Sequence, residues 1–448
     1  MTKNETGRNR LEEALSIDSF EEAVSFLLET PKFTSKHDIK ETASFLDTLG
    51  NPDRRFKIIH VAGTNGKGSV CMMMSDILRA HGFSVGLFTS PHLVDMRERI
   101  RMGDDLITAE DFLASFKSVT AAIKKRGDDY FPTFFEYLFF MAMVYYREKA
   151  PDYVILETGL GGRLDATNSV SDKLLSVITR IGLDHTEYLG DTIEKIASEK
   201  AGIIKPGIPV VYDAYVPGAA RVIKDTARES GSECIGVSPD LLSEERKLHK
   251  NIAFSLKTRY YDDVCLEMGQ AAHYQIENAS VAVFASEYIL GEKTFDPTKT
   301  KEALKSFFWP GRMQEIAPGV IIDGAHNTDG IRAFLESAGA DGHDGKRRLI
   351  FSAVSDKDYT GMLDMIADSG LFEKVTVTGI KSSRGMSPEE LLDGVKSEKD
   401  AHFVISDKDA YDTLSEERAG RAEDEIIYVA GSLYLVGEIM EKLKNDQL

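Results

Sequence analysis

The sequence predicts an α/β protein with two domains. A parallel-sheet domain with a phosphate-binding loop, of the P-loop ATPase type, is expected over residues 1–296, and a smaller Rossmann-like α/β domain over 313–448, with a hinge at 297–312. Short apolar runs alternate with helical segments, which is typical of parallel sheets covered on both faces. The alternation breaks at the sequence WPGR, residues 309–312, and then restarts. A chain of 448 residues is long enough for two or three domains.

The first domain is expected to begin with helices and to continue as alternating strands and helices. The pattern predicts helices over 11–28 and 38–49, and strands over 57–62, 84–89, 153–158, 174–179 and 209–212. Residues 134–146 are the most apolar run, but this run is too short for a membrane span and carries Glu136, so we expect a buried helix. Residues 240–267 alternate and are polar, which predicts an antiparallel ribbon; a helix over 274–290 and a break over 291–300 follow.

The second domain repeats the alternation on a smaller scale. Its expected strands lie at 320–323, 348–354, 374–378, 403–405 and 426–430, and a last helix is expected over 432–444. The size of this part of the chain is ordinary for a domain.

Composition limits the classes of function. The formal net charge of −19 argues against a nucleic-acid-binding surface, and an anionic substrate would need a local positive patch. Cys71, Cys234 and Cys265 show no paired spacing, so we expect a reducing, cytoplasmic location and no disulfide framework. The first ten residues have no apolar signal core, and we expect no membrane partner.

The most specific motif is HVAGTNGKGSV, residues 60–70. An apolar strand leads into a glycine-rich turn that opens into a helix near Gly68, so backbone N–H groups face a polyanion such as a nucleotide phosphate. The generic Walker pattern fails, because Val61 and Gly68 stand where Gly and Ser or Thr are required. A tight turn with a solvated Lys67 is the alternative. The residues predicted to bind ATP here are Gly63, Thr64, Asn65, Gly66, Lys67, Gly68 and Ser69.

Three polar residues follow or close predicted strands. Ser90, Glu157 and His185 would meet at one edge of a parallel sheet, where ligands gather. With phosphate oxygens and water they could hold one magnesium ion, which prefers few carboxylates. Taken singly, Glu157 could instead cap a helix and His185 could be a hydrogen-bonded loop residue. Asp184 is expected to orient His185.

These motifs together resemble the folylpolyglutamate synthase and dihydrofolate synthase family, relatives of the Mur ligases. The resemblance rests on GTNGKGS at 63–69, on the segment 157–168, on PTFFE at 132–136 and on DGAHN at 323–327, and it spans residues 49–432. It implies that 1–296 is a Mur-ligase-like ATP-binding domain with a folate site, and that 313–448 is the glutamate-ligase domain.

The resemblance also implies roles for single residues. The family's metal ligands match Ser90, Glu157 and His185. Lys200 matches a catalytic lysine that is often carbamylated, which requires a neutral amine, although it could be an ordinary helix-end lysine. The nucleotide is contacted by the equivalents of Asn278, Arg312 and Asp323, and His326 is catalytic, orienting the terminal phosphate or the amino acid. Asn278 could instead be an ordinary helix residue, Arg312 could form a surface ion pair, and Asp323 or Asn327 could cap a helix.

The resemblance places the pterin near residues 132–136. The folate-binding candidates are Thr133, Phe134, Phe135, Glu136 and Arg97. Aromatic rings could bury the flat pterin, although a helix start with buried aromatics is an equally possible role. Arg97, Arg99 and Arg163 are expected to form the positive patch that attracts a folate carboxylate. The segments 352–358 and 431–433 are expected near the amino acid.

The implied function is an ATP-dependent ligase that adds L-glutamate to dihydropteroate or tetrahydrofolate through an acyl phosphate, with ATP and Mg²⁺. We expect a monomer whose partners are small molecules. A Mur-like ligase acting on another carboxylate is the nearest alternative, but only 66 residues precede Lys67, too few for the additional domain of those enzymes. A P-loop ATPase without ligase activity and a scaffold are further alternatives. The choice of acceptor, the glutamate chain length and any monovalent-ion requirement stay open.

Overall fold

The computed structural model describes residues 3–31, 38–127, 130–248, 251–270, 272–382, 384–393, 395 and 402–446. The chain forms two compact units, and each unit is assembled from separate segments. Unit 1 comprises residues 1–180, 197–239 and 281–300, and unit 2 comprises 181–196, 240–280 and 301–448. The chain passes into unit 2 for the last time at residues 300–301. The predicted domain limits at 296 and 313 stay a prediction.

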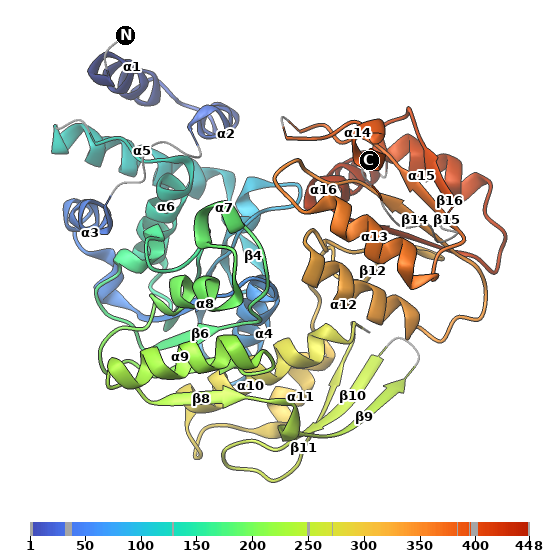
Figure 1. The fold of residues 1–448 in the computed structure, drawn as a ribbon. Coiled ribbons are helices and arrows are strands. Elements are labelled where there is room, and N and C mark those ends of the chain that lie inside the picture. The colour runs from blue at the N-terminus through green and yellow to red at the C-terminus, as the bar shows by residue number, and fades with distance from the viewer. Residues whose placement is uncertain are drawn as a thin grey trace. The chain divides into compact units, whose positions relative to one another are not determined.

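Unit 1 is built on a mostly parallel sheet, which confirms the predicted fold class (Figure 1). In the described part of the chain its strand order is β4-β3-β2-β5-β1-β6-β7-β8, and only β3, which pairs antiparallel with both β2 and β4, runs against the other strands. The strands are β1 (Lys57–Ala62), β2 (Val85–Phe88), β3 (Ile100–Met102), β4 (Asp105–Leu106), β5 (Tyr153–Glu157), β6 (Leu175–Ile178), β7 (Val210–Asp213) and β8 (Cys234–Val237).

The register of the central strands positions the functional loops. Val61 of β1 pairs with Glu157, the last residue of β5, and Ala62 pairs with Ile178, the last residue of β6. The loops that follow β1, β5 and β6 therefore leave the sheet at the same edge, as expected for parallel strands.

Helices enclose this sheet and build its core. They are α1 (Lys3–Leu15), α2 (Phe20–Glu29), α3 (Ile39–Thr48), α4 (Lys67–Ala80), α5 (Ala109–Arg126), α6 (Phe134–Lys149) and α9 (Pro217–Glu229), with short 3₁₀ helices at Pro52–Arg55, Met96–Arg99, Ala166–Ser169 and Pro239–Leu241. The apolar run at 134–146 forms the buried helix α6, as predicted, and Tyr137, Phe139 and Phe140 are fully enclosed.

Two predictions about helices in this region are wrong. Residues 11–28 do not form one helix, because Ser19 and Glu22 form a capping box that starts α2 separately from α1. The predicted break at 291–300 contains the start of α11 (Pro297–Lys305), where the Asp296 carboxylate accepts the Thr298 N–H at 2.8 Å. Helices α8 (Ile193–Ala201), α10 (Tyr274–Leu290) and α11 each contain residues of both units.

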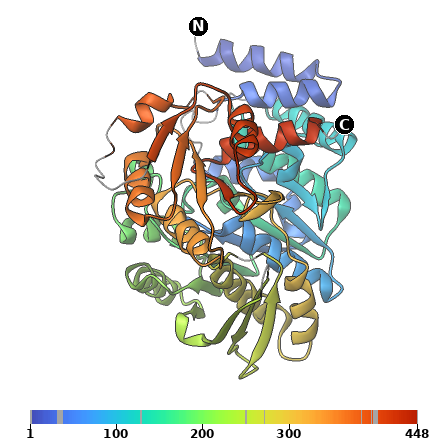
Figure 2. The same cartoon turned by 90° about the vertical axis from the view of Figure 1, so that its right-hand side faces the viewer.

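Unit 2 holds two sheets (Figure 2). The expected ribbon over 240–267 is confirmed as an antiparallel sheet of order β11-β10-β9, with β9 (Leu242–Leu248), β10 (Asn251–Leu256) and β11 (Val264–Met268). In the described residues the larger sheet has the order β12-β13-β17-β14-β15-β16. Its strands are β12 (Gln314–Ala317), β13 (Val320–Ile322), β14 (Arg347–Phe351), β15 (Lys374–Val377), β16 (His402–Ile405) and β17 (Ile426–Ala430).

The five strands predicted for the second domain all occur, and β12 is an additional antiparallel edge strand. The helices of unit 2 are α7 (Thr186–Leu189), α12 (Thr328–Gly339), α13 (Tyr359–Ser369), α14 (Pro388–Leu392), α15 (Ala410–Ala419) and α16 (Leu433–Asp446). Phe334, Phe351 and Tyr428 lie at the centre of its core. Across the described ranges, every helix is too short or too polar to cross a lipid bilayer.

Candidate active site

The phosphate loop joins β1 to α4 and is hydrogen-bonded to the loop after β6. The N–H groups of Thr64 and Asn65 both donate to the carbonyl of Arg180, at 2.9 and 3.2 Å. Gly66 has φ +83°, a left-handed conformation that glycine adopts without strain, and α4 begins at the next residue. The first turn of a helix has N–H groups with no acceptor inside the helix. Lys67 and Gly68 begin this turn and are therefore suited to bind an anion.

Lys200 lies directly against this loop. Its side chain is buried, and its Nζ donates to the carbonyl of Gly63 at 2.6 Å. A Cβ atom on Gly162 would lie 2.8 Å from the carbonyl oxygen of Lys200, so the glycine loop after β5 packs closely on the end of α8. The predicted catalytic lysine is thus next to the phosphate loop within unit 1.

Glu157 and Ser90 also meet here. The Ser90 N–H donates to Oε2 of Glu157 at 2.9 Å, and Oε1 of Glu157 is 3.9 Å from Nζ of Lys67. The Glu157 side chain is buried, so its charge is placed beside Lys67 in a region of low dielectric. The buried Glu157 carboxylate supplies hard oxygen atoms of the kind that Mg²⁺ prefers, and the backbone of Ser90 lies against it. His185, the third predicted metal ligand, belongs to unit 2. No group of three or more His, Cys, Asp or Glu side chains able to hold a metal occurs in the portion of the chain described.

The predicted pterin segment forms the start of α6. Thr133 and Glu136 form a capping box: the Thr133 N–H and Oγ1–H donate to Oε2 of Glu136 at 2.8 and 2.9 Å. Phe134 is buried beneath the guanidinium of Arg99, 5.3 Å from its ring centre. A Cβ on Gly159 would lie 2.7 Å from the Phe135 ring, so this ring covers the loop that follows Glu157. The helix-capping role is confirmed for Thr133 and Glu136, and folate binding by this segment stays a prediction.

The three arginines of the predicted positive patch each have partners. Arg97 pairs with Asp95 at 2.6 Å, and Arg163 lies 3.3 Å from Glu199. Arg99 is buried and donates from Nε to Nδ1 of His92 at 2.8 Å. The charges of Arg97 and Arg163 are therefore partly compensated, which weakens the argument for a patch that attracts folate.

In unit 2 the segment after β13 is built around Asp323. This buried carboxylate accepts the Tyr274 hydroxyl at 2.6 Å, the Met313 N–H at 2.9 Å and the Ala325 N–H at 2.8 Å. Burial raises the pKa of Asp323, against the opposing effect of the Arg312 charge. Nη1 of Arg312 donates to the Gly311 carbonyl at 3.1 Å. Arg312 is therefore close enough to Asp323 for its charge to act on that carboxylate, and the nucleotide role of both residues stays a prediction.

Asn278, the other predicted nucleotide ligand, is in α10. It is buried and donates from Nδ2 to Oε1 of Gln275 at 2.9 Å. This contact is a one-turn side-chain pair within the helix. Its nucleotide role stays a prediction.

A polar cluster in unit 2 joins the loop after β6 to the segments after β13 and β14. Lys357 donates to Oδ1 of Asp184 at 2.5 Å and lies 3.4 Å from Nε2 of His185. Asn327 donates to Oδ2 of Asp184 at 3.0 Å, and Nε2 of His326 lies 3.8 Å from the same oxygen. Lys357 and the two histidines hold the pKa of Asp184 well below its usual range, although burial opposes them. The His185 N–H donates to Oδ1 of Asp184 at 2.8 Å, and the role of Asp184 in orienting His185 stays a prediction.

His326 has one ring nitrogen, Nε2, that can accept a hydrogen bond. Its Nδ1 lies 2.8 Å from the Gly324 carbonyl, which can only accept, so Nδ1 carries the hydrogen. Burial, with the charge of Lys357, lowers the pKa of His326 to about 4. The ring is therefore neutral at pH 7, with its Nε2 lone pair on the side of Asp184.

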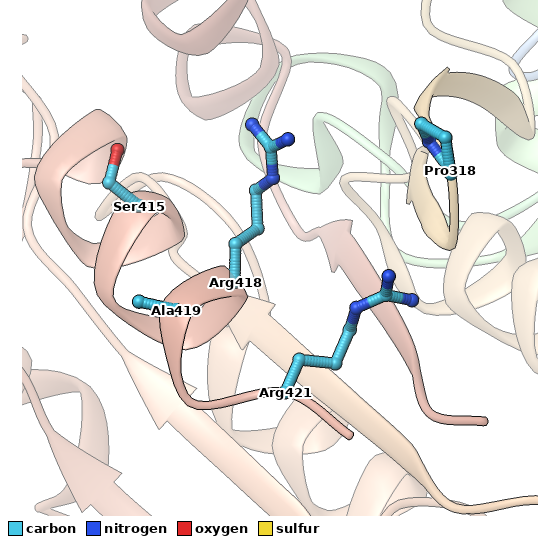
Figure 3. Close-up of a pocket in the computed structure, with 5 residues that line it drawn as sticks. All are labelled: Pro318, Ser415, Arg418, Ala419 and Arg421. Atoms are coloured by element: carbon cyan, nitrogen blue, oxygen red, sulfur yellow. The ribbon is translucent and has the colours of Figure 1, made fainter. Parts of the chain in front are cut away.

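A separate cavity of about 430 Å³ lies at the opposite end of β13 from Asp323. It is lined by Pro318, Ser415, Arg418, Ala419 and Arg421. Figure 3 shows the side chain of Arg418 extending from the last turn of α15 and that of Arg421 extending from the loop that follows the helix. None of the predicted site residues lines this cavity.

Sequence reasoning missed Lys357 and Tyr274 as members of these clusters. Lys357 belongs to the segment 352–358, which was expected near the amino acid, but its pairing with Asp184 joins residues 173 positions apart. Tyr274 sits at the start of a predicted helix and gave no separate signal. Lys173 and His60, buried beside the phosphate loop, were missed as well.

Known proteins are similar to this chain in sequence and in fold. The Mur ligase middle domain matches residues 61–286, and the Mur ligase glutamate ligase domain matches residues 311–433. The chain is 32% identical to the dihydrofolate synthase/folylpolyglutamate synthase of Bacillus subtilis over 95% of this chain and 99% of that protein. It is 30% identical to the folylpolyglutamate synthase of Lacticaseibacillus casei over the same shares. The structure of E. coli FolC in complex with DHPP and ADP is similar with a TM-score of 0.83 and 28% identity, covering 96% of this chain and 99% of that one.

Proposed function

Because the chain belongs to the folylpolyglutamate synthase and dihydrofolate synthase family of Mur ligases, we propose that it adds L-glutamate to dihydropteroate and also extends reduced folates. It is an ATP-dependent ligase that forms an amide bond through an acyl phosphate. The observation that carries the proposal is the meeting of Lys67, Glu157 and Lys200 at one glycine-rich phosphate loop.

The chemistry follows from the weakness of a carboxylate as an electrophile. Transfer of the γ-phosphoryl group of ATP to the acceptor carboxylate gives an acyl phosphate. The amine of glutamate attacks it, a tetrahedral intermediate forms, and phosphate leaves. The protein mainly positions these groups and neutralises the charge on the transferring phosphoryl group. Lys67, at the start of α4, is placed for this role.

Mg²⁺ supplies a Lewis acid that neutralises phosphate charge. Ser90 and Glu157 would hold it from unit 1, and His185 is proposed as the third protein ligand. If this is correct, Glu157→Gln and His185→Ala should each raise the magnesium concentration needed for half-maximal activity, while the KM for pterin stays close to the wild-type value. An unchanged magnesium requirement in both variants would remove these residues from the metal site.

The groups of unit 2 are assigned to the nucleotide and the incoming amino acid. Arg312 would bind phosphate, Asp323 would hold the ribose or base, and Asn278 would help to seat the nucleotide. The neutral His326 has a lone pair on Nε2 that can accept a hydrogen from the glutamate amine or orient the terminal phosphate.

The proposed carbamate on Lys200 has its own test. Lys200→Ala should be inactive, and a small carboxylate such as acetate should restore part of the activity if the native side chain carries a carbamate. Mass measurement of the intact protein, kept at mildly alkaline pH with bicarbonate, measures the modification directly. A bare amine in the active protein would refute this assignment.

The acceptor is decided by product analysis. Purified protein is incubated with ATP, Mg²⁺ and labelled glutamate, with dihydropteroate in one reaction and tetrahydrofolate in another. We expect label in both products and phosphate release that requires both acceptor and glutamate. Label in a cell-wall precursor but in no pterin would favour the Mur-like alternative, and ATP hydrolysis independent of glutamate would favour an ATPase without ligase activity.

We also propose that the protein acts as a monomer in the cytoplasm. Cys71, Cys234 and Cys265 are free thiols, which is typical of a reducing compartment. Light scattering during size-exclusion chromatography tests the oligomeric state.

A further inference from the structure

A chain of four buried polar side chains runs beside the phosphate loop in unit 1. Its members are Lys173, His60, Thr167 and Asp165, and we refer to them as the buried polar chain. Each is at most 6% exposed. Nζ of Lys173 is 2.6 Å from Nδ1 of His60, Nε2 of His60 is 2.7 Å from Oγ1 of Thr167, and this hydroxyl is 2.5 Å from Oδ1 of Asp165. None of these residues has a role in the reaction described above.

The hydrogens in this chain have one consistent direction. Asp165 accepts three further N–H groups, from Gly159, Leu160 and Thr167, so it is an ionised carboxylate. The single hydroxyl hydrogen of Thr167 therefore points to Asp165, and the hydroxyl oxygen must accept from Nε2–H of His60.

The same counting fixes the other end. Burial lowers the pKa of His60 well below its ordinary value, so its ring has one hydrogen, on Nε2, and Nδ1 accepts from Lys173. Lys173 also donates to Oδ1 of Asn168 at 2.7 Å and to the Ile203 carbonyl at 3.2 Å. Nζ of Lys173 therefore has three acceptors within hydrogen-bond distance. Burial and the charge of Lys205 lower the pKa of Lys173, and Asp165 opposes this.

The two ends of the chain hold the backbone on either side of the predicted catalytic groups. Asp165 fixes the N–H groups of Gly159 and Leu160, two and three residues after Glu157. Lys173 fixes Ile203 directly, three residues after Lys200. His60, the second member, belongs to β1, which leads into the phosphate loop.

Asn168 connects Lys173 to the backbone near Lys200 by a second route. It accepts from Lys173, and its Nδ2 donates to the Gly202 carbonyl at 3.1 Å and to the Arg163 carbonyl at 3.0 Å. The loop after β5 and the end of α8 are therefore joined through the buried Lys173 side chain.

We propose that Lys173 is a positioning residue, which through the buried polar chain holds the loop after Glu157 and the segment after Lys200 in register with the phosphate loop. The proposal rests on the proposed function, because Glu157 and Lys200 are catalytic only if the ligase assignment is correct. It adds residues to which the proposed function assigns no contact with nucleotide or acceptor.

The test is the variant Lys173→Met, which keeps most of the side-chain volume and removes all three hydrogen bonds. We expect kcat for glutamate-dependent phosphate release to fall at least tenfold, while the KM values for ATP and pterin stay within about threefold of wild type. Hydrogen exchange should accelerate at 159–160 as well as at 202–204, because the buried polar chain holds both segments. A kcat within twofold of wild type, or exchange that accelerates at 202–204 alone, would overturn the proposal.

Thr167 provides a second variant if Lys173→Met does not fold. Thr167→Val keeps the shape and cuts the chain at its centre, while Lys173 keeps its bonds to Asn168 and Ile203. We expect a lower kcat and faster exchange at 159–160, and recovery of both in Thr167→Ser. Wild-type kcat in Thr167→Val would refute the proposal that Lys173 positions the loop after Glu157 through the buried polar chain.

A matched control separates positioning from general loss of stability. Asp53 is also buried, and it accepts the N–H and hydroxyl of Ser171, two residues from Lys173, at 2.9 and 2.8 Å. Asp53→Ala should lower the melting temperature and leave kcat within twofold. An equal loss of kcat in Asp53→Ala would show that the Lys173 effect is merely structural. The exchange measurements need no substrate, so failure of the ligase assay in the wild type would refute the proposed function without deciding this one.

Discussion

At the scale of single residues, Lys67 is held in position by contacts within unit 1. Its Nζ donates to the Thr64 carbonyl at 3.1 Å, and Glu157 lies 3.9 Å away. The ammonium is thus fixed by its own loop, so little reorganisation is needed when negative charge develops on a phosphoryl group.

Replacing Lys67 with Ala should therefore remove catalysis without unfolding the protein. We expect kcat to fall by about 10²–10³ or more, the range typical for loss of one such transition-state contact. Phosphate release measures activity, and circular dichroism measures the fold. Turnover near the wild-type value would refute the phosphate-loop assignment, and an unfolded variant would indicate a structural lysine.

Asp76, in α4, predicts a pH-dependent stability. Burial, with the nearby charge of Asp104, raises the pKa of Asp76 from 3.8 to about 7. The folded state binds this proton more tightly than the unfolded state, so the contribution to stability is fully present below the ordinary pKa of 3.8 and is lost as the pH rises from there to about 7. Asp76→Asn should consequently gain about 1–3 kcal/mol relative to wild type between pH 5 and pH 8. Urea denaturation at the two pH values measures this, and an equal difference at both would contradict it.

At the scale of elements, the start of α6 is a helix cap in a segment that was also predicted to bind folate. The Thr133–Glu136 capping box satisfies N–H groups at the start of the helix. The adjacent Phe135 covers Gly159 in the loop after Glu157. The two roles can be separated by mutation, because a serine can cap the helix as a threonine does.

We expect Thr133→Ala to lower the free energy of unfolding by about 0.5–2 kcal/mol, and Thr133→Ser to lower it much less. Denaturant titration measures both. If Thr133 also binds folate through its methyl group, Thr133→Ser will raise the KM for pterin while stability is kept. Equal destabilisation by Ala and Ser would contradict the capping role.

The contact between Gly159 and Phe135 makes a second prediction at this scale. A methyl group on Gly159 would lie 2.7 Å from the Phe135 ring, closer than van der Waals contact allows. Gly159→Ala should therefore displace the ring or the loop and reduce both stability and kcat. The double variant Gly159→Ala with Phe135→Leu should recover part of the lost melting temperature. If Gly159→Ala alone behaves as wild type, the two segments do not pack as described.

At the scale of the whole molecule, the two units are assembled from interleaved segments. Residues 240–280 belong to unit 2, although unit 1 segments precede and follow them. From this part of the chain Tyr274 bonds to Asp323, and Gln270 donates to the carbonyls of Trp309 and Arg312 at 3.1 and 2.9 Å. The proposed nucleotide residues of the larger sheet are therefore supported by a distant part of the sequence.

A fragment of residues 301–448 should for this reason be less stable than unit 2 within the full chain. We expect it to melt at a lower temperature and to show faster hydrogen exchange at 311–313 and 323–325, where the contacts with Gln270 and Tyr274 are lost. The same segments in the full-length protein serve as the control. Equal protection in fragment and full chain would show that residues 240–280 do not support this region.

The sequence by itself determined the strands, the phosphate loop and the family. The strand over Lys57–Ala62 and the five strands of the second domain are apolar runs of local pattern, and GTNGKGS is specific in its own residues. Helix ends were less well predicted: the Ser19 capping box that divides 11–28 and the Asp296–Pro297 start of α11 are short signals inside longer patterns.

Only the tertiary structure decided which side chains meet. Lys357 and Asp184 are 173 positions apart, and Lys173 and His60 are 113 apart. Such pairs depend on strand order and register, which bring distant segments to one sheet edge and leave no local periodicity in the sequence. Burial, which sets the pKa of Asp76, His326 and Asp323, likewise exists only after the helices have packed, because it is a property of the surroundings and not of the residue.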